Sequence, residues 1–359
     1  MRRKPVETYI PIVLETIGYS PEMDRWAVHA DARVGRVVRV DRGVAGVLTE
    51  AGALRSSFGS NLLNDMAKDP AAGPCAGDFV VIRDWPDHRN TLEQVIPRRT
   101  AVIRATAGTQ SLGQVLGANM DLAAVVVSLH PAPAMSKVER LLVLAWESGA
   151  QPVVVLTKAD TVPDAALVAE DVAAAAPGVE VICTSTVTGE GIARLRDLVD
   201  GRHTIALLGS SGSGKSSLTN ALVGADVLTT RGIREDGRGR HTTVRRELVV
   251  LPGGGAVIDT PGLRGIGIMD GGVGMPQTFP DIEELVSRCR FADCRHRTEP
   301  GCAVAHAIAD GILPVRRFES WQRLQREMEW MAARKDARLR AARIGRRRKM
   351  TARRGEPPE

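Results

Sequence analysis

Hydrophobic and polar positions first follow a β-like pattern along this chain. Residues 34–40 alternate between apolar and polar, and further short β-rich runs follow at 45–49, 79–82 and 92–96. Glycine, aspartate and proline separate these runs, and several short strands punctuated in this way predict a small β-barrel. We expect a barrel of the OB type, a fold that commonly binds oligonucleotides. Residues 1–32 show little periodicity and predict a loosely packed arm.

A different pattern begins after a linker at 98–117. Continuous apolar runs predict buried strands at 122–129, 153–156, 179–182 and 204–208, and helical periodicity predicts helices between them at 136–149, 163–176 and 191–199. Apolar strands that alternate with helices predict a parallel sheet covered on both faces, so the expected class is α/β. A long helix is expected at 318–343, with its apolar stripe packed in a core.

The last predicted strand leads directly into the motif G-x-x-x-x-G-K-S, and a helix is expected to follow. This arrangement of strand, loop and helix is the phosphate-binding P-loop, in which glycines let backbone N–H groups approach a polyphosphate. A glycine- and serine-rich loop before an ordinary helix is the alternative, which the complete motif in its context disfavours. The residues expected to hold the nucleotide here are Gly209, Ser210, Ser211, Gly212, Ser213, Gly214, Lys215, Ser216 and Ser217.

Two further motifs downstream complete the phosphate half of the site. Asp259 and Gly262 form D-x-x-G at a strand end, where the carboxylate would hold Mg²⁺ through water and the Gly262 amide would sense the γ-phosphate. Ser216 would bind the same ion through its hydroxyl. The glycine-rich stretch before that strand contains Thr242 and Thr243, and one of the two, for which we take Thr243, could supply another Mg²⁺ ligand.

A base-binding motif lies upstream of the P-loop rather than downstream. Thr157, Lys158, Ala159 and Asp160 form T-K-x-D at a strand end, and Ser185 ends the next strand, where a base-supporting loop belongs. A carboxylate at this position can accept both N1–H and N2–H₂ of guanine, which adenine does not offer, and this predicts selection of GTP. Alone the motif also fits an ordinary turn. The order of the motifs predicts a circular permutation.

A Cys/His cluster follows the GTPase motifs. Its members are Cys289, Cys294, His296 and Cys302, within fourteen residues. Three thiolates and one imidazole form the closed tetrahedral shell of a structural Zn²⁺ site. Chance clustering of reduced thiols is the alternative, because the spacing departs from common zinc-finger patterns.

Domain order and motifs together closely resemble the circularly permuted, small-ribosomal-subunit-dependent GTPases, the RsgA or YjeQ family. The resemblance covers about 34–321 and is carried by 77–80, 118–121, 156–160, the P-loop, 239–243 and 259–262. It implies an N-terminal OB domain, a permuted GTPase, a C-terminal zinc domain, and a role in late maturation of the 30S subunit with its 16S rRNA. Two positions depart from the pattern: Thr157 replaces the asparagine of the general GTPase motif, and Val244 stands where a third threonine is common.

Catalysis must differ from that of many GTPases. The residue after Gly262 is Leu263, which cannot orient the attacking water as a glutamine does. Intrinsic hydrolysis is therefore expected to be slow, with another group placing the water. His241 is the nearest candidate for this catalytic role, and contact with RNA or shaping of the loop is an equally weighted alternative.

Composition and charge indicate the compartment in which the protein acts and the partners of its tail. The 359 residues contain five cysteines and no apolar run near the ~20 residues of a membrane span, so we expect a cytoplasmic monomer that does not contact a membrane. The net charge is +6, yet residues 334–354 contain eleven of the 48 basic residues and one of the 42 acidic residues, which leaves the rest of the chain mildly acidic. Such a tail indicates an arm that binds nucleic acid or an anionic membrane.

The expected organisation is an arm at 1–32, an OB domain at 33–97, a linker at 98–117, a permuted GTPase domain at 118–272, a zinc-binding domain with a long helix at 273–333 and a basic tail at 334–359. The predicted function is hydrolysis of GTP to GDP and phosphate in 30S assembly, with Mg²⁺ and one Zn²⁺ as cofactors. One alternative is a permuted GTPase of large-subunit assembly. Another is an RNA-binding module that uses GTP only as a structural or switch ligand.

Overall fold

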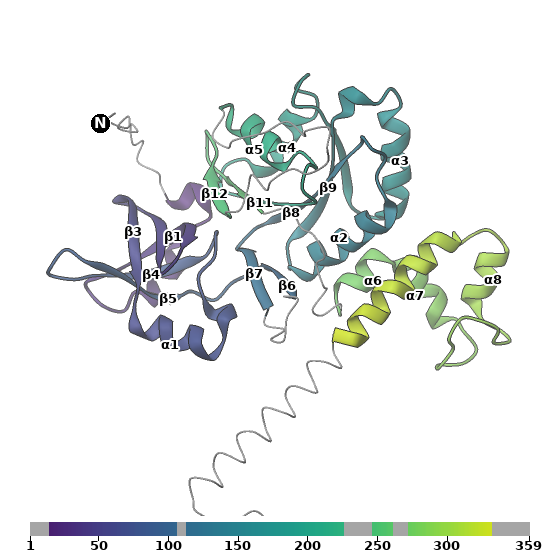
Figure 1. The fold of residues 1–359 in the computed structure, drawn as a ribbon, viewed down its shortest axis with the longest axis horizontal. Helices are drawn as coiled ribbons and strands as arrows, with labels where there is room; N and C mark the ends of the chain where they lie inside the picture. Colours follow the sequence, from purple (N-terminus) through teal and green to yellow (C-terminus); the bar gives the residue numbers. More distant parts are fainter. Residues whose placement is uncertain (1–13, 106–112, 226–245, 261–271, 332–359) are drawn as a thin grey trace, which may run out of the picture.

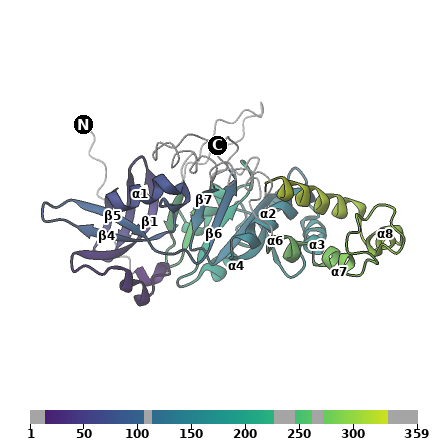
Figure 2. The same ribbon diagram turned by 90° about the horizontal axis from the view of Figure 1, so that it is seen from below.

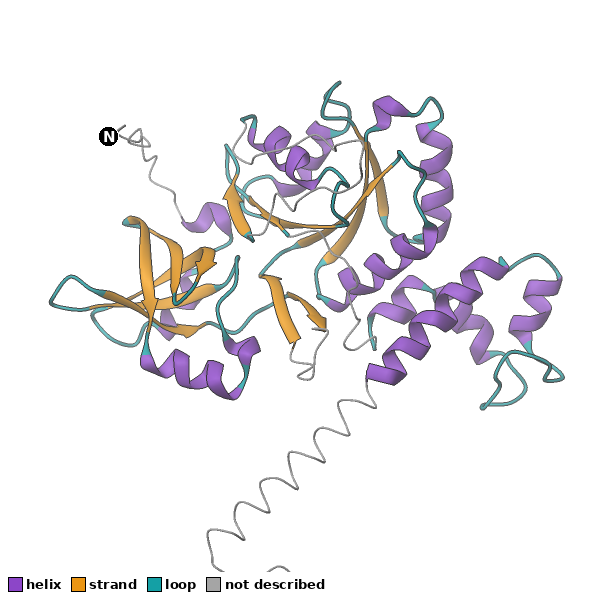
Figure 3. Cartoon of the chain, in the orientation of Figure 1, coloured by secondary structure: helices purple, strands orange, loops and turns teal. Residues whose placement is uncertain are grey.

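The computed structural model of the chain describes residues 14–105, 113–225, 246–260 and 272–331. Three parts lie in a row: a β-barrel, a sheet flanked by helices, and a helical C-terminal part (Figures 1 and 2). Coloured by secondary structure, the barrel consists of strands with a helix beside them, and the C-terminal part consists of helices joined by loops (Figure 3).

The N-terminal barrel closes with five strands. They are β1 (Ala32–Asp41), β2 (Val44–Thr49), β3 (Gly52–Phe58), β4 (Phe79–Asp84) and β5 (Asn90–Val95), in the order β1-β2-β3-β5-β4. β1 also pairs with β4, which closes the barrel, and β3 runs parallel to β5. Helix α1 (Ser60–Lys68) lies between β3 and β4 and contributes Leu62 to a core with Val37, Val80 and Leu92. The expected OB-type barrel is confirmed.

The N-terminal arm is better packed than its sequence predicted. Two short 3-10 turns, η1 (Leu14–Ile17) and η2 (Pro21–Trp26), precede the barrel. Leu14 and Ile17 are buried in the large central core. The prediction of a loosely packed arm is therefore wrong at Leu14 and Ile17, because turns this short show no apolar periodicity.

The central sheet has the predicted parallel arrangement. Its strands are β8 (Leu122–Ser128), β9 (Gln151–Thr157), β10 (Glu180–Thr184), β11 (Thr204–Leu208) and β13 (Ala256–Asp259), in the order β10-β9-β8-β11-β13, with antiparallel β12 (Glu247–Val250) beside β13. The helices are α2 (Met135–Glu147), α3 (Ala165–Ala175), α4 (Ile192–Val199) and α5 (Lys215–Val223). Val125 packs in one core with residues of α2 and α3, and Val126 packs in another core with α4 and α5. Helices therefore cover both faces of the central sheet.

Barrel and sheet are joined directly. β12 pairs antiparallel with β1, with Arg39 opposite Glu247, so the strands of the two parts form one continuous sheet. Beside this junction Arg36 is fully buried, and its guanidinium donates to the carbonyl oxygens of Ile17, Gly77 and Asn119. One side chain thus connects the arm, the barrel and the entry to the sheet.

The segment predicted as a linker contains regular structure. β6 (Ala101–Ala105) and β7 (Gly113–Ala118) form a separate two-stranded antiparallel sheet between the barrel and the main sheet. The two strands pair with each other, and their ends also bind distant segments: the Ala101 amide donates to the carbonyl oxygen of Ser148 and the Ala118 amide to that of Ala76. This pairing was not predicted from the sequence.

The C-terminal part is helical and is anchored to α2. Its helices are α6 (Gly274–Thr278), α7 (Pro280–Ser287), α8 (Ala303–Ala309) and a helix over 315–331, which begins three residues before the predicted start and whose predicted end lies outside the described residues. Trp321 and Leu324 are buried in a core with Phe279, as predicted for the apolar stripe. Arg317 binds Glu139 of α2 and Asp281 of α7. No described helix is long and apolar enough to span a bilayer.

Candidate functional site

The P-loop connects β11 to α5, as its sequence predicted. Gly209 lies so close to β8 that a Cβ there would be 2.4 Å from the carbonyl oxygen of Val126, and Gly214 has φ +92°. Only glycine fits both positions without displacing the backbone. The loop therefore presents its amide groups at the first turn of α5, where the helix dipole favours an anion.

Lys215 is held inside this loop. Its Nζ donates to the carbonyl oxygens of Gly209 at 3.1 Å and Ser210 at 2.8 Å, and the residue is 6% exposed. Burial lowers the pKa of Lys215 to about 8, against the attraction of Asp259. A bound polyphosphate would favour the charged ammonium form of Lys215. Its oxygens would replace the two carbonyl oxygens as the partners of Nζ.

Ser216 and Asp259 form a corner suited to a divalent cation. The Ser216 hydroxyl donates to Oδ2 of Asp259 at 2.9 Å. Asp259 is 1% exposed, burial raises the pKa of its carboxyl group, and Oδ1 has no hydrogen-bond partner among the described residues. A buried carboxylate oxygen without a donor, next to a hydroxyl, fits the oxygen ligands that Mg²⁺ prefers.

The base loop follows β9 and is supported by the loop after β10. Lys158 has φ 62°, and after this left-handed residue the chain turns through η4 (Ala159–Thr161), which leaves Asp160 exposed. Oδ1 of Asp160 accepts a hydrogen bond of 2.5 Å from the Ser185 hydroxyl. The oxygen of Ser185 in turn accepts from the amides of Val187 and Thr188, both at 3.1 Å. The carboxylate is thereby oriented while remaining accessible to a base.

Sheet topology brings the two halves of the site together. β9 and β10 carry the base loop, whereas β11 and β13 carry the phosphate loops, and all four strands are parallel members of one sheet. The loops after parallel strands lie at the same edge of a sheet, which is where ligands bind in open α/β folds. Four of the predicted residues, His241, Thr242, Thr243 and Gly262, lie outside the described residues.

The Cys/His cluster is assembled in the C-terminal part. One ligand atom from each of Cys289, Cys294, His296 and Cys302 lies within 4.8 Å of the others. Nδ1 of His296 is 3.5 Å from Sγ of Cys289 and 3.6 Å from Sγ of Cys302, and the two sulfurs are 3.9 Å apart. A tetrahedron with ordinary Zn–S and Zn–N bonds has edges of about 3.8 Å between sulfurs and about 3.5 Å from sulfur to nitrogen. The donor set fits Zn²⁺, and so do the three separations among Cys289, His296 and Cys302.

Neighbouring groups hold the cluster in shape. Glu299 accepts the backbone amides of Arg295 and Arg297, and these hydrogen bonds lower the pKa of its carboxyl group to about 2. The His296 ring meets Phe318 and Trp321 edge-on, each at 6.0 Å between centroids. The cluster is therefore tied to the helix over 315–331, and its closed ligand set leaves no position for a catalytic water.

Comparison with known proteins places the chain in a family. A family model described as RsgA GTPase matches residues 95–269, and another described as 50S ribosome-binding GTPase matches 204–336. The small ribosomal subunit biogenesis GTPase RsgA of Streptomyces coelicolor is 50% identical over 311 residues, which cover 86% of this chain and 83% of that protein. The chain belongs to the RsgA GTPase family. It is therefore a GTP hydrolase with a circularly permuted fold.

More distant relatives agree with this family. RsgA 1 of Listeria innocua is 38% identical over 322 residues, covering 89% of this chain and 91% of that protein. The crystal structure of YjeQ from Thermotoga maritima has a TM-score of 0.61 at 24% identity and covers 83% of this chain and 98% of that one, which supports the fold. The structure of YloQ, titled a circularly permuted GTPase, gives 0.57 at 25% identity, with 84% and 96% covered.

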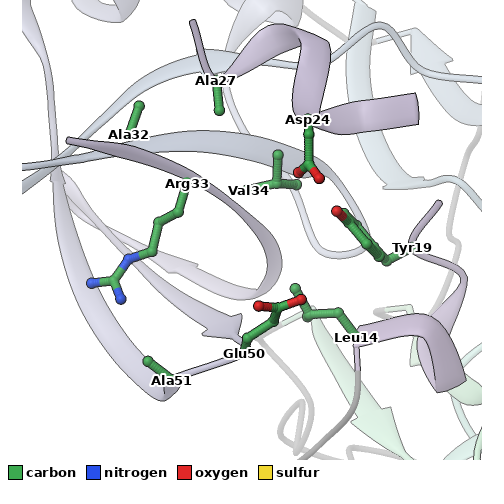
Figure 4. A pocket seen from close by; sticks show the side chains of 9 residues that line it. All are labelled: Leu14, Tyr19, Asp24, Ala27, Ala32, Arg33, Val34, Glu50 and Ala51. Carbon is green, nitrogen blue, oxygen red and sulfur yellow. The ribbon is translucent and has the colours of Figure 1, made fainter. Parts of the chain in front are cut away.

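A separate hollow lies away from the GTPase motifs. It has a volume of about 330 Å³ and lies between the N-terminal turns and the barrel, where Leu14, Tyr19 and Asp24 face Arg33 and Glu50 (Figure 4). Burial and a hydrogen bond to Asp24 raise the pKa of Tyr19 to about 12. No residue of the nucleotide motifs lines this hollow.

The buried charges that connect the parts were not predicted from the sequence. Glu139 is fully buried in α2, where it accepts hydrogen bonds from Arg316 and Arg317. Its position one turn before Leu142 places a carboxylate within the apolar stripe of that helix. A charged residue among the core positions of a helix was the available signal.

Proposed function

We propose that this GTPase acts in assembly of the small ribosomal subunit, binding the 30S particle through its 16S rRNA. The observation that supports this most is the combination in one chain of an OB barrel, a permuted GTPase sheet and a Cys₃His cluster. Relatives at 50% and 38% identity are named small ribosomal subunit biogenesis GTPases. An OB barrel suits contact with RNA, and so do the arginines beside the Cys₃His cluster, which are Arg288, Arg290, Arg295 and Arg297.

GTP would bind across the edge of the sheet with Mg²⁺. Lys215 and the P-loop amides would hold the β- and γ-phosphates, and Ser216 and Asp259 would hold the ion, the latter through water. Thr243, or Thr242 in its place, and Gly262 would complete the γ-phosphate side. When bound, Mg²⁺ would neutralise part of the negative charge of the phosphates.

Guanine would be selected by Asp160. The Ser185 hydroxyl already satisfies one oxygen of that carboxylate at 2.5 Å and leaves the side chain exposed for N1–H and N2–H₂ of the base. Lys158 would pack along the base, and Ala159, 6% exposed, packs in the central core. Adenine would leave the carboxylate without donors, which is costly in a binding site.

No glutamine follows D-x-x-G in this chain, so hydrolysis would depend on another group to orient the attacking water. Leu263 occupies that position, so we propose that His241 positions the attacking water once the ribosomal partner has bound. This makes the intrinsic reaction slow and the subunit its activator. GDP and phosphate would be the products.

Zinc would be structural, held by Cys289, Cys294, His296 and Cys302 as one ion per chain. We further propose a cytoplasmic monomer with an OB domain at 33–97, a permuted GTPase domain at 118–272 and a zinc-binding domain at 273–333, with the basic tail at 334–359 adding phosphate contacts to RNA. Each such contact would add to the salt dependence of binding.

Hydrolysis measured with 30S subunits, with 50S subunits and with neither tests this function, with GTP compared with ATP. We expect slow turnover alone, strong stimulation by 30S only, and no use of ATP. Stimulation by 50S alone would favour large-subunit assembly, a possibility raised by the family model at 204–336. Single-turnover hydrolysis that 30S leaves unchanged would contradict the proposal and favour GTP as a structural ligand of an RNA-binding module.

A further inference from the structure

One row of side chains crosses from the nucleotide site into the barrel. Asp259 of β13 lies directly opposite Glu247 of β12, and Glu247 lies directly opposite Arg39 of β1. Both strand pairs are antiparallel, and residues directly opposite each other in such a pair point to the same face, with Cβ atoms about 4.5–5.5 Å apart. Asp259 binds the Ser216 hydroxyl on this face. Glu247 and Arg39 therefore follow Asp259 along the face that holds the corner suited to Mg²⁺.

The register of β12 fixes this placement of Glu247. The next residue, Leu248, is buried in the central core together with Ile258, its partner on β13. Because successive side chains of a strand point to opposite faces, a shift of one residue would bring the charged Glu247 into that core. Packing of Leu248 thus keeps the carboxylate of Glu247 beside that of Asp259.

The carboxylates of Asp259 and Glu247 repel each other across the two strands. Asp259 is 1% exposed and Glu247 is half-buried, so water screens the repulsion less than it would at the surface. Burial raises the pKa of Asp259, and the negative charge of Glu247 acts in the same direction. Like charges directly opposite each other destabilise a sheet, whereas Mg²⁺ is usually bound by one or two carboxylates together with phosphate oxygens. A bound divalent cation would therefore stabilise this pair.

Arg39 places a positive charge on the other side of Glu247. Its side chain is 34% exposed, and its Nε lies 3.3 Å from Oδ2 of Asp41. The guanidinium therefore offsets part of the negative charge of the row from the barrel side. Because the side chain is partly exposed, we expect this effect to be moderate and to weaken as salt is added.

We infer that Glu247 is a positioning residue of the Mg²⁺ site and that Arg39 of the barrel moderates it. Glu247 would act through its charge beside Asp259, which increases the attraction for the cation, and Arg39 would reduce that attraction. The barrel would thereby take part in metal binding, because its strands are continuous with those of the GTPase sheet. Glu247 can have this role only if Mg²⁺ binds at Ser216 and Asp259, as proposed above.

Binding of a fluorescent, non-hydrolysable GTP analogue to the full chain tests this role without relying on turnover. Affinity is measured over a series of free Mg²⁺ concentrations and again in EDTA. Glu247→Gln removes the charge and keeps the shape, so half-maximal tightening should require about threefold more Mg²⁺ or higher. In EDTA the same variant should bind the analogue at least as tightly as the wild type, because one negative charge near the phosphates is gone.

Arg39 variants should act in the opposite direction. Arg39→Met removes the moderating charge, so half-maximal tightening should require about twofold less Mg²⁺ or lower. Added salt should reduce this shift, since the side chain is partly exposed. Arg39→Lys keeps the charge and should behave as the wild type. Opposite shifts in Glu247→Gln and Arg39→Met are a result that a general loss of structure would not produce.

Arg33→Met and Glu180→Gln are the matched controls. Arg33 also lies on β1, with a side chain 35% exposed and Nη2 at 2.8 Å from Oδ1 of Asp84, but its strand partner is Ile82 of the barrel. Glu180 is the first residue of β10, where it binds Arg194 at 2.8 Å, whereas the base-supporting loop follows the other end of that strand. Both variants should leave the Mg²⁺ requirement unchanged.

Three outcomes would contradict the inference in distinguishable ways. An unchanged Mg²⁺ requirement in Glu247→Gln, beside a wild type whose binding responds to Mg²⁺, overturns it. Weaker binding of the analogue in both Glu247→Gln and Arg39→Met, with and without Mg²⁺, assigns the row a structural role only. A wild type that binds the analogue equally well with and without Mg²⁺ contradicts the proposed metal site itself, and Glu247 then has no ion to attract.

Discussion

The Thr157 hydroxyl donates a hydrogen bond of 2.8 Å to the carbonyl oxygen of Ser213. Thr157 ends β9, and Ser213 lies in the loop after β11, two strands away in the sheet order. Both residues are buried, at 4% and 3% exposure. The base loop and the phosphate loop are therefore in direct contact, through the position where the general GTPase motif has asparagine.

Replacing Thr157 by valine should weaken the binding of both GTP and GDP. The substitution keeps the shape but leaves a buried carbonyl without its donor, which costs about 1–3 kcal/mol. Fluorescent-nucleotide titration should show affinity falling by roughly fivefold or more for both nucleotides. Thr49→Val is the matched control, because Thr49 is equally buried and donates to the carbonyl oxygen of Gly52 at 2.8 Å in the barrel. Equal nucleotide affinity in both variants would disprove the coupling.

Changing Asp160 to asparagine should change the preferred base. An amide can donate to the 2-carbonyl of xanthine, where the carboxylate accepted from N2–H₂ of guanine. GTP affinity should fall by about 100-fold or more, and xanthosine triphosphate should become the better ligand. Competition between the two triphosphates measures this directly, and an unaltered preference would remove Asp160 from the base site.

Nucleotide binding should take up a proton in mildly alkaline solution. Burial lowers the pKa of Lys215 to about 8, so at about pH 9 much of the free protein has a neutral amine, which the bound phosphates would recharge. Calorimetry in buffers of different ionisation enthalpy should detect this uptake at about pH 9 and little of it near pH 6.5. Lys215→Met should abolish the difference in proton uptake between the two pH values. If this variant took up as many protons at about pH 9 as the wild type does, the uptake could not be assigned to Lys215.

The same lowered pKa has a consequence for stability. The ordinary pKa of lysine is 10.5, so between about 8 and 10.5 the unfolded state binds more protons than the folded state. The contribution of Lys215 to the free energy of unfolding therefore rises with pH across that window.

The Cys/His cluster should bind about one Zn²⁺ per purified chain, since it offers four protein ligands. Cys294→Ser should lose the ion and destabilise the C-terminal part, because binding of a structural metal is coupled to folding. Elemental analysis and hydrogen exchange over 272–331 report the two effects. Cys183→Ser, a half-buried cysteine outside the cluster, should retain the metal. A folded wild type without zinc would exclude the site.

The buried pairing of Arg317 with Glu139 should dominate the docking of the C-terminal part. Arg317 is 5% exposed, whereas Arg316, which binds the same carboxylate, is 47% exposed. Arg317→Met should destabilise this part by about 3–5 kcal/mol, because it removes the buried partner of Glu139 and leaves that buried carboxylate only the half-exposed Arg316. Arg316→Met should cost less than about 1 kcal/mol. Urea unfolding followed by hydrogen exchange at α7 and α8 compares them, and equal effects would refute this account.

Local pattern was sufficient for much of the fold. The P-loop, T-K-x-D and D-x-x-G each depend on a few consecutive residues at a strand end, and the strands before them are apolar throughout. The N-terminal turns and the hairpin β6–β7 were missed because their order comes from contacts with distant segments. Leu14 packs in the central core, and the Gly255 amide binds the carbonyl oxygen of Thr16.

The amino-acid sequence by itself determined the class of chemistry, because motif spacing and motif order are properties of neighbouring residues. It predicted the P-loop, the guanine carboxylate, the permuted order and the four cluster ligands. Only the tertiary structure decided how these parts are joined: Thr157 to Ser213, Arg36 to three carbonyl groups, Glu139 to Arg317, and Arg39 to Glu247. These contacts join residues tens to more than a hundred positions apart. A buried polar group must find its partner in three dimensions, and no local pattern specifies which partner that is.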